Sequence, residues 1–481
     1  MHTLAETVPV ENTPSPHALH VLDQTPFSAF HARTMITTGM GVFTDGYDLV
    51  SISVVLPLVL HSLGVEKLTG FQSSLLVSAA LLGSAAGALL FGVLANAGRK
   101  RYYGIDVLLM AIAALAQAFV GSVGQLIAVR TLLGVGVGAD YVLSPMIMAE
   151  HANARDRGKT LTVGFSLMWV LGAASAALLQ IILDRLGLPP DLQWRITLAA
   201  GVIPAASVIV LRRRLPETPR YYAHIKGDGA ALKAVVAHVA GDDAAAMVTT
   251  GSVGLGVRDY FARFWRRFAM VCILWFVYDI VIYAAGLFGP SLLSQSVGLT
   301  PAEFQLLNFL VFSVPGSLLA VLLVDRWGRK PLQAWGFVLM GVMLGVYALT
   351  YHPQAGTPLW GIALFASPLW ALALYGLFIL WNQAGPGSIS GAGMLGVEMA
   401  ATRVRGLVQG LSVTAGRLGA ALGVFVFPAL FAAKGQAFAM GFLGAMALLG
   451  ALLTIFGVPE TSKVSLEQSG GDAHAHAAAG G

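Results

Sequence analysis

The chain has 481 residues, of which 56% are apolar and only 11% are charged. Soluble domains carry about 25% charged residues, and a soluble chain of this length would form about three domains. The 29 Lys and Arg and the 24 Asp and Glu residues are too few to cover three such surfaces, which excludes a soluble protein. The net charge of +5 is scattered over short loops and does not indicate nucleic-acid binding. The single cysteine, Cys272, excludes a disulfide framework and a cysteine-based zinc site.

In chain order, residues 1–32 lack a basic region followed by an apolar core, so they predict a tail rather than a cleaved signal peptide. Apolar runs long enough to cross a bilayer as helices follow, each near the required 20 residues. They are far longer than barrel strands, so the fold class is an all-α membrane protein. The twelve predicted spans are 34–61, 71–95, 102–121, 123–149, 160–183, 194–211, 267–295, 303–324, 332–351, 358–384, 404–432 and 436–457.

The loop charges predict the orientation. Most Lys and Arg residues lie in the loops after the even-numbered spans, and the odd-numbered loops hold only Lys67, Arg185, Arg195 and Lys434. Positive loops stay in the cytoplasm, so we expect both termini there. The predicted parts are a tail (1–32), a six-helix bundle (33–211), a linker (212–264) with short surface helices in its Ala-rich stretch 229–247, a second six-helix bundle (265–458) and a tail (459–481).

Three motifs at the cytoplasmic ends of the spans occur twice, in the same order and at offsets of 230 to 248 residues. Each is weak alone, but together they indicate an internal duplication. The pairs are Gly98-Arg99-Lys100 with Gly328-Arg329-Lys330, the E-x4-R-x-R-G run of Glu150, Arg155, Arg157 and Gly158 with that of Glu398, Arg403, Arg405 and Gly406, and Pro216-Glu217-Thr218 with Pro459-Glu460-Thr461.

Two parallel six-span halves with a substrate site between them are the organisation of major facilitator transporters. The repeated loops, the Arg130 to Gly138 run and the PETPR sequence after span six resemble the signatures of that superfamily. The resemblance implies a conformational latch in each half, complete around Asp325 but altered in the first half, where Asn96 replaces the usual Asp. The implied gating residues are Gly98, Arg99, Glu150, Arg157, Asp325, Gly328, Arg329, Glu398 and Arg405.

Ionisable residues at membrane depth are costly and usually functional. Asp45, Asp140 and Asp279 reach similar depths, about 15–18 Å from the charged end of their spans at 1.5 Å per residue. Burial disfavours the charged form of a carboxyl, so such a group can take up a proton on one side and release it on the other. The predicted proton-coupling residues are Asp45, Asp48, Arg130, Asp140 and Asp279.

Static ion pairing is the alternative role for these acids. A buried Arg130 needs a partner, and Asp48 is a candidate. Asp279 is the favoured proton carrier because its span has no basic residue beyond the first turn. Arg417, in span eleven, is left open, because a long side chain near the end of a span can snorkel to the interface.

Trp275, Asp279 and Tyr283 are spaced four residues apart and share one stripe of a helix. An indole, a carboxyl and a phenol in a row can hydrogen-bond a small oxyanion or polyol, although aromatic stripes also serve packing. Tyr141, beside Asp140 and near Ser144, gives the other half a similar polar patch. The GVGVG run in span four follows no strand and does not predict a dinucleotide site.

Four motifs resemble the phosphate:proton symporter family, over residues 33–460: Thr44 to Asp48, Gly138 to Ser144, the aromatic stripe, and Gly328 to Gln333. The resemblance implies that Asp45 and Asp140 belong to the proton path. It also implies that Tyr141, Trp275, Asp279 and Tyr283 contact phosphate, with Asp279 coupling both.

Two positions depart from that family. Met168 replaces a Gln in span five, and Gly387 replaces the Asn that follows the Gly-Pro of span ten. Either Asn382 and Gln383, one turn earlier, supply the missing hydrogen bonds, or the substrate has changed. The predicted substrate-binding residues are Tyr141, Trp275, Asp279, Tyr283, Asn382 and Gln383.

The leading prediction is proton-driven import of inorganic phosphate by alternating access. The alternative is proton symport of a sugar or organic acid, which a wider and less polar cavity at Met168 and Gly387 would suit. A nutrient sensor typically carries a long cytoplasmic extension, whereas the tail 459–481 is short. The sequence has no recognisable nucleophile–base pair or cluster of metal ligands that would indicate an enzyme. We expect a monomer, multi-pass in the cell (plasma or inner) membrane, that contacts lipid and uses no cofactor or metal.

Overall fold

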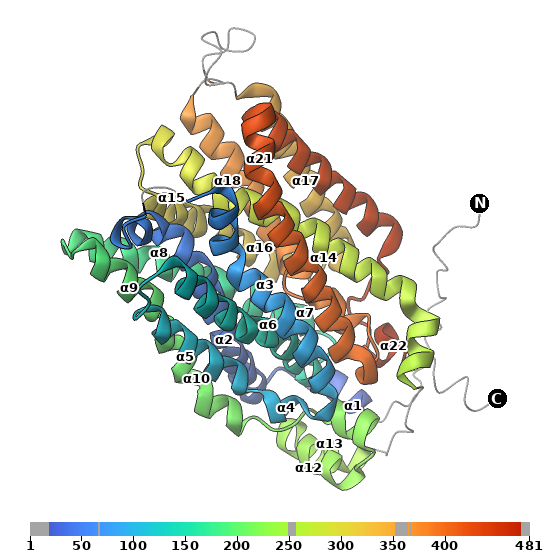
Figure 1. The fold of residues 1–481 in the computed structure, drawn as a ribbon. Helices are drawn as coiled ribbons and strands as arrows, with labels where there is room; N and C mark the ends of the chain where they lie inside the picture. Colours follow the sequence, from blue (N-terminus) through green and yellow to red (C-terminus); the bar gives the residue numbers. More distant parts are fainter. Residues whose placement is uncertain (1–18, 66–67, 249–255, 352–363, 365–366, 473–481) are drawn as a thin grey trace.

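The structure is a computed structural model that describes residues 19–65, 68–248, 256–351, 364 and 367–472, without the side chains of 287–292 and 295. The described residues form helices and no strands (Figure 1). The helices are α1 (His20–Gln24), α2 (Ala29–Ser62), α3 (Gly70–Leu94), α4 (Arg99–Tyr102), α5 (Ile105–Gln117), α6 (Val123–His151), α7 (Arg157–Leu161), α8 (Met168–Arg185), α9 (Pro190–Ala199), α10 (Val202–Arg214), α11 (Pro219–Tyr221), α12 (Gly229–Ala240), α13 (Asp242–Met247), α14 (Val257–Leu293), α15 (Pro301–Asn308), α16 (Val314–Leu323), α17 (Arg329–Thr350), α18 (Pro368–Ala384), α19 (Pro386–Ile389), α20 (Met394–Glu398), α21 (Thr402–Gly457) and α22 (Leu466–Gly470). Three π-helical segments join them: Thr162–Leu167, Tyr222–Lys226 and Phe309–Ser313.

Nine helical stretches of the described residues are long and apolar enough to cross a membrane. One is α21, whose 56 residues are broken at Gly435, where φ is 82°; the break divides predicted spans eleven and twelve. Spans three and ten correspond to α5 and α18, which have 13 and 17 residues, and the first residues of 358–384 lie outside the described ones. The all-helical membrane fold is confirmed, whereas twelve crossings and cytoplasmic termini stay predictions.

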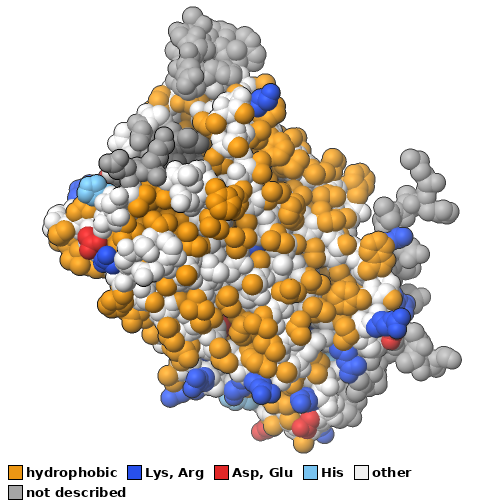
Figure 2. Space-filling model, in the orientation of Figure 1, with side chains coloured by type: hydrophobic (Ala, Val, Ile, Leu, Met, Phe, Trp, Pro, Cys, Tyr) orange, Lys and Arg blue, Asp and Glu red, His pale blue; other side chains and the backbone are white. Residues whose placement is uncertain are grey.

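The surface of the molecule has an apolar belt and a basic end. Figure 2 shows hydrophobic side chains over most of the face in view, with Lys and Arg gathered along the end where Figure 1 places α4, α12 and α13. The helices α1 and α22 lie at the same end (Figure 1); we call it the basic end. This distribution is what the predicted orientation requires.

Glycines bring α3 into backbone contact with two other helices. A Cβ on Gly87 would lie 2.2 Å from the Val135 carbonyl oxygen, and one on Gly138 would lie 2.0 Å from that of Ser84, so no side chain fits between α3 and α6. Toward α21, Gly92 faces Gly406 and Gly410 at similarly short range. Small residues that allow such approach are typical of packed membrane helices, and α3–α21 is a contact between the predicted halves.

The helix α10 continues into the predicted linker, since Arg212, Arg213 and Arg214 form its last turn. The boundary between the first bundle and the linker stays a prediction. The Ala-rich stretch 229–247 forms α12 and α13, which confirms the predicted surface helices. Their apolar sides bury Leu232, Val236 and Val239 against Leu19 and Leu22 of the α1 region, which gives the basic end a small core of its own.

Candidate substrate and proton site

A central cavity of about 100 Å³ lies between the predicted halves. Its walls come from α2, α6, α8, α14, α15, α18, α19, α21 and the π-helical segments Thr162–Leu167 and Phe309–Ser313. The structure brings all six predicted substrate-binding residues to this one cavity: Tyr141, Trp275, Asp279, Tyr283, Asn382 and Gln383.

Asp279 has a basic partner, although its own span contains no basic residue beyond the first turn. Arg417 of α21 lies 3.3 Å from the Asp279 carboxylate and donates a 2.5 Å hydrogen bond to the Tyr283 hydroxyl. Its guanidinium also stacks 4.1 Å from the centre of the Tyr141 ring. The basic partner comes from a helix distant in sequence, and only 1% of Arg417 is exposed, so this residue does not snorkel. Its Nε and Nη2 groups have no hydrogen-bond partner among the described residues.

Hydroxyl groups at the π-helical turn of the first half extend the polar wall. Ser166 donates a 3.0 Å hydrogen bond to the Gln383 side chain and accepts one of 2.8 Å from Ser388. A π-helical turn inside a helix often marks a functional site. Met168, the predicted departure, packs toward Gly39 and is not among the residues that line the cavity, so Ser166 supplies the hydrogen-bonding group at this wall.

Gly387 does line the cavity, between two polar groups of α14 and α18. A Cβ at Gly387 would lie 3.1 Å from the Gln383 Oε1 and 3.2 Å from the Tyr278 hydroxyl. The glycine therefore leaves room for the Gln383 side chain, and the neighbouring Asn382 reaches the same space. This placement favours the prediction that Asn382 and Gln383 replace the missing amide.

Asp140 belongs to an ion cluster that the sequence reading missed. Arg212 of α10 donates hydrogen bonds of 2.6 Å to Asp140 and 2.5 Å to Asp106 of α5, and Ser144 donates one of 2.5 Å to Asp140. All four side chains are fully buried. The loop charges place Arg212 in the predicted basic linker, and the predicted membrane charges do not include Asp106, inside predicted span three. Matching charges near the same end of adjacent spans is the signal that would have paired them.

The alternative pairing of Asp48 with Arg130 is not formed. Arg130 donates to the Gln117 side chain at 3.2 Å and to the Asp48 backbone carbonyl at 3.4 Å. The carboxylate oxygens of Asp48 and of Asp45 have no hydrogen-bond partner among the described residues, although both side chains are fully buried. The role of Asp45 in proton coupling stays a prediction.

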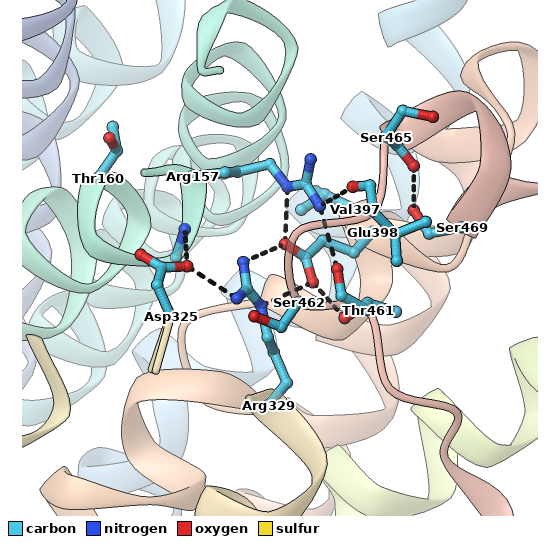
Figure 3. A network of polar contacts seen from close by, with 12 residues as sticks. Arg157, Thr160, Asp325, Arg329, Val397, Glu398, Thr461, Ser462, Ser465 and Ser469 are labelled. Atoms are coloured by element: carbon cyan, nitrogen blue, oxygen red, sulfur yellow. Dashed lines mark hydrogen bonds and ion pairs between the residues drawn. The ribbon is translucent and has the colours of Figure 1, made fainter. Parts of the chain in front are cut away.

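The predicted gating residues lie at the basic end in two clusters, and each cluster contains one arginine from the other half. Glu150 accepts hydrogen bonds from Arg99 of its own half at 3.1 Å, from Arg405 of the other half at 2.7 Å, and from Thr218. Glu398 repeats the pattern, with Arg329 at 3.0 Å, Arg157 from the other half at 2.7 Å, and Thr461 at 2.5 Å (Figure 3). Each carboxylate thus joins the two halves.

The two latches differ where the motif differs. Asp325 accepts hydrogen bonds from the backbone of Lys159 at 2.8 Å and from Arg329 at 2.8 Å (Figure 3). Asn96, two residues before Gly98, instead donates at 2.8 Å to the backbone carbonyl of Arg403. The first latch is therefore closed by a neutral donor instead of a carboxylate. Gly98 and Gly328 enable both tight turns, with φ of 138° and 100° that favour glycine.

Comparison with known proteins identifies the family of this chain. The family described as sugar (and other) transporter matches residues 34–471. Relatives include the probable inorganic phosphate transporter 1-10 of Oryza sativa subsp. japonica, 32% identical over 94% of this chain and 92% of its own, and the probable inorganic phosphate transporter 1-6 of Arabidopsis thaliana, 29% identical over 94% and 96%.

Solved structures show the same fold. The proton:xylose symporter XylE bound to 6-bromo-6-deoxy-D-glucose superposes with a TM-score of 0.78, at 22% identity over 93% of this chain and 99% of that one. A partially occluded inward-open XylE from E. coli gives a TM-score of 0.70 at 20% identity over 90% and 99%. The chain therefore belongs to the sugar (and other) transporter family, and is a multi-pass membrane transporter of the major facilitator superfamily.

Proposed function

We propose that the chain imports inorganic phosphate together with protons, by alternating access, as a monomer in the cell membrane. The observation that carries this proposal is Arg417, a buried cation at the cavity with two N–H groups that no described residue accepts. Guanidinium groups bind oxyanions through paired hydrogen bonds and stay charged when buried. The names of the relatives, inorganic phosphate transporters, support the same substrate.

Asp279 provides the coupling between proton and anion. While its carboxylate is ionised it neutralises Arg417 at 3.3 Å, and a phosphate ion entering the cavity meets little net positive charge. A proton on Asp279 removes that competition, so the guanidinium becomes available to the anion. Proton and phosphate therefore bind together, and loss of the proton on the far side restores the Asp279–Arg417 pair and expels the anion.

The latches at the basic end control which side of the cavity opens. With Glu150 and Glu398 each bonded to arginines of both halves, the basic end is held shut. Release of substrate toward that end requires both cross-half pairs to break. Ion pairs of this kind, buried and hydrogen-bonded on both sides, are costly to interrupt singly, so the two latches open together.

A second candidate is proton symport of a sugar or organic acid. The aromatic lining by Tyr141, Trp275 and Tyr283 suits a sugar ring, and the XylE structures are named for a proton:xylose symporter. A neutral sugar, however, gains nothing from the positive charge of Arg417, whereas a carboxylate or phosphate does. Selectivity for anions therefore separates phosphate from a sugar, and competition between phosphate and small carboxylates separates phosphate from an organic acid.

The test is uptake of labelled phosphate into liposomes that hold the purified chain, with an inward proton gradient. We expect uptake that collapses when the gradient is dissipated, and its loss in Arg417→Gln. An exposed basic residue, Arg155, changed to Gln gives a matched control that should keep full uptake. Absence of phosphate uptake in vesicles with folded protein would overturn the phosphate assignment, and xylose and small organic acids would then be tested with the same gradient.

A further inference from the structure

A further polar wall of the substrate cavity comes from α15 and the π-helical segment Phe309–Ser313. Gln305, Asn308 and Ser313 line the cavity there, and all three side chains are buried. None of them is among the predicted substrate-binding residues. The Asn308 Oδ1 atom and the Ser313 hydroxyl have no hydrogen-bond partner among the described residues. This wall therefore has hydrogen-bonding groups that are left for a ligand.

One hydrogen bond fixes the orientation of the Asn308 amide. Its Nδ2 atom donates at 2.8 Å to the Phe304 backbone carbonyl, one turn earlier on the same helix. A backbone carbonyl only accepts hydrogen bonds, so an amide turned the other way would bring two acceptors into contact. The Oδ1 atom of Asn308 is therefore the free group, and it can accept a hydrogen bond from a ligand but cannot donate one.

Asn308 lies at the depth of the Arg417 contacts. The short connection 294–300 turns the chain back, so α15 runs antiparallel to α14. Gln305 of α15 donates at 3.4 Å to the Gly286 carbonyl of α14. Asn308 lies three residues beyond Gln305, and Tyr283 lies three residues before Gly286, which is about 4.5 Å along each helix. Asn308 is therefore level with Tyr283, whose hydroxyl accepts a hydrogen bond from Arg417.

Asn382 of α18 offers a second free acceptor at the cavity, since its Oδ1 atom also has no hydrogen-bond partner among the described residues. The Tyr375 hydroxyl donates at 3.1 Å to the Ala285 carbonyl of α14, and Gly387, later in the chain, lies beside the Tyr278 hydroxyl. Asn382 is therefore level with Tyr278. The two amide oxygens are separated by about five residues of α14, or roughly 7.5 Å along its axis.

The cavity thus combines one cation with two acceptors that need a donor. Arg417 attracts an anion, whereas the amide oxygens of Asn308 and Asn382 require O–H groups on the same ligand. A small oxyanion with an O–H···O bond of about 2.7 Å at each end spans roughly the separation of the two oxygens. Dihydrogen phosphate carries two O–H groups and hydrogen phosphate carries one, whereas sulfate carries none near neutral pH.

We propose that Asn308 is a specificity-determining residue, which accepts an O–H group of the bound oxyanion and rejects tetrahedral anions that have none. The inference rests on the proposed phosphate transport and names the form of the ligand, a protonated oxyanion. Sulfate would place an oxygen against the Asn308 Oδ1 atom with no proton between them, which leaves two buried acceptors unsatisfied. Sites that hydrogen-bond a substrate hydroxyl reject analogues without it by a factor of about 10⁴–10⁵. Ser313 cannot discriminate in this way, because a hydroxyl donates or accepts.

The experiment measures displacement of labelled phosphate from the purified full chain by unlabelled phosphate, arsenate and sulfate at one pH. Arsenate keeps the O–H groups and should compete like phosphate, whereas sulfate should need at least about a thousandfold higher concentration. Asn308→Leu removes the acceptor at similar volume. We expect the sulfate-to-phosphate ratio of its competition constants to fall at least about tenfold, with the arsenate-to-phosphate ratio unchanged. Asn308→Ser should show the same fall, because its hydroxyl can donate to sulfate, and it serves if the leucine variant does not fold.

The matched control is Ser313→Ala, on the same wall, which should weaken phosphate and sulfate alike and keep the wild-type ratio. A wild-type ratio in folded Asn308→Leu and Asn308→Ser, or equal competition by sulfate and arsenate in the wild type, would overturn the inference and leave phosphate binding intact. Wild-type protein that binds no labelled phosphate would instead overturn the proposed function, and this inference with it.

Discussion

Arg157 and Glu398 lie 2.7 Å apart across the boundary between the predicted halves, and both side chains are fully buried. Arg157 also donates to the Val464 backbone carbonyl at 2.9 Å, so the same guanidinium ties down the segment that leads to α22. One side chain therefore links the first half, the second half and the tail. Loss of this arginine should loosen all three at the basic end.

We expect Arg157→Gln to favour opening of the basic end. Glu398 keeps Arg329, so the loss at Glu398 is that of one charged hydrogen bond, about 1.5–3 kcal/mol, or at least roughly tenfold in the open population. The hydrogen bond to the Val464 carbonyl is lost as well, which acts in the same direction. The measurement is labelling of a cysteine at position 160, which is buried beside this latch, by a membrane-impermeant maleimide in a Cys272→Ala background. Arg155→Gln is the exposed control, and equal labelling rates in both variants would refute the latch role.

Asp279→Asn should uncouple binding from transport. The amide imitates the protonated acid, so Arg417 stays available to phosphate. Binding of labelled phosphate should lose the pH dependence that Asp279 imposes between pH 5.5 and 8 and keep only that of the second ionisation of phosphate itself. Net uptake should fall by at least about a hundredfold, because the charge that expels the anion is missing. Scintillation proximity binding and liposome uptake on the same preparation measure the two quantities. Binding that still depends on pH as in wild type would contradict the coupling role of Asp279.

Gly138→Ala should destabilise the protein through the α3–α6 contact. The new methyl group would meet the Ser84 carbonyl oxygen at 2.0 Å, and overpacking of this kind costs about 1–3 kcal/mol or more. We expect a lower thermal unfolding midpoint in detergent. Gly124→Ala, on the same helix but facing open space, is the matched control and should unfold like wild type. A Gly138→Ala variant as stable as that control would show that the two helices can separate without loss.

Docking of the tail helix α22 should weaken as the pH rises. Arg220 donates 2.8 Å and 2.9 Å hydrogen bonds to Glu467 of α22 and to Asp23 of α1, and His224 lies 3.8 Å from Glu467. Burial raises the pKa of Asp23 to about 6. The pKa of His224 is also raised; burial alone would lower it, but the nearby carboxylates of Glu467 and Asp472 outweigh that effect.

Asp23 and His224 both make the docking of α22 weaker as the pH rises. The docked state retains a proton on Asp23 between about pH 4 and 6 that the undocked state loses, and a protonated His224 stabilises docking until the pH rises through its raised pKa. A spin label at position 468, which is exposed on α22, should be less mobile at pH 5.5 than at pH 8. The double variant Asp23→Asn, His224→Asn should lose this difference, and equal mobility of the wild-type label at both pH values would contradict docking by these groups.

The parts of the site that follow helical spacing could be predicted from the sequence. Trp275, Asp279 and Tyr283 reach the cavity together because residues four apart share a face of one helix, whatever the rest of the chain does. The repeated loop motifs likewise meet at one end, because a duplicated half places equal motifs at equal depth. Both inferences need only local geometry and the number of spans between motifs.

The partners that arrive from distant helices could not be predicted in this way. Arg417 and Asp279 are 138 residues apart, and which face of α21 meets α14 depends on the packing of the whole bundle. Arg212 was hidden for a different reason: positive residues at the end of a span are usually solvated anchors, and only its contact with Asp106 and Asp140 reveals a buried role. The exchange of Arg157 and Arg405 between the latches is also a property of the assembled halves alone.

The contact of α3 with α21 has a mechanical consequence. At Gly92, Gly406 and Gly410 the two helices meet backbone to backbone, with no side chains interlocked between them at that level. Interdigitated side chains resist the sliding of one helix along another, because each side chain must leave the gap that it fills on its neighbour. Helix surfaces that meet at glycines lack this resistance. The two halves can therefore tilt against each other at this contact. The helix α3 packs tightly on α6 through its other glycines, so these two helices move together as one rigid body.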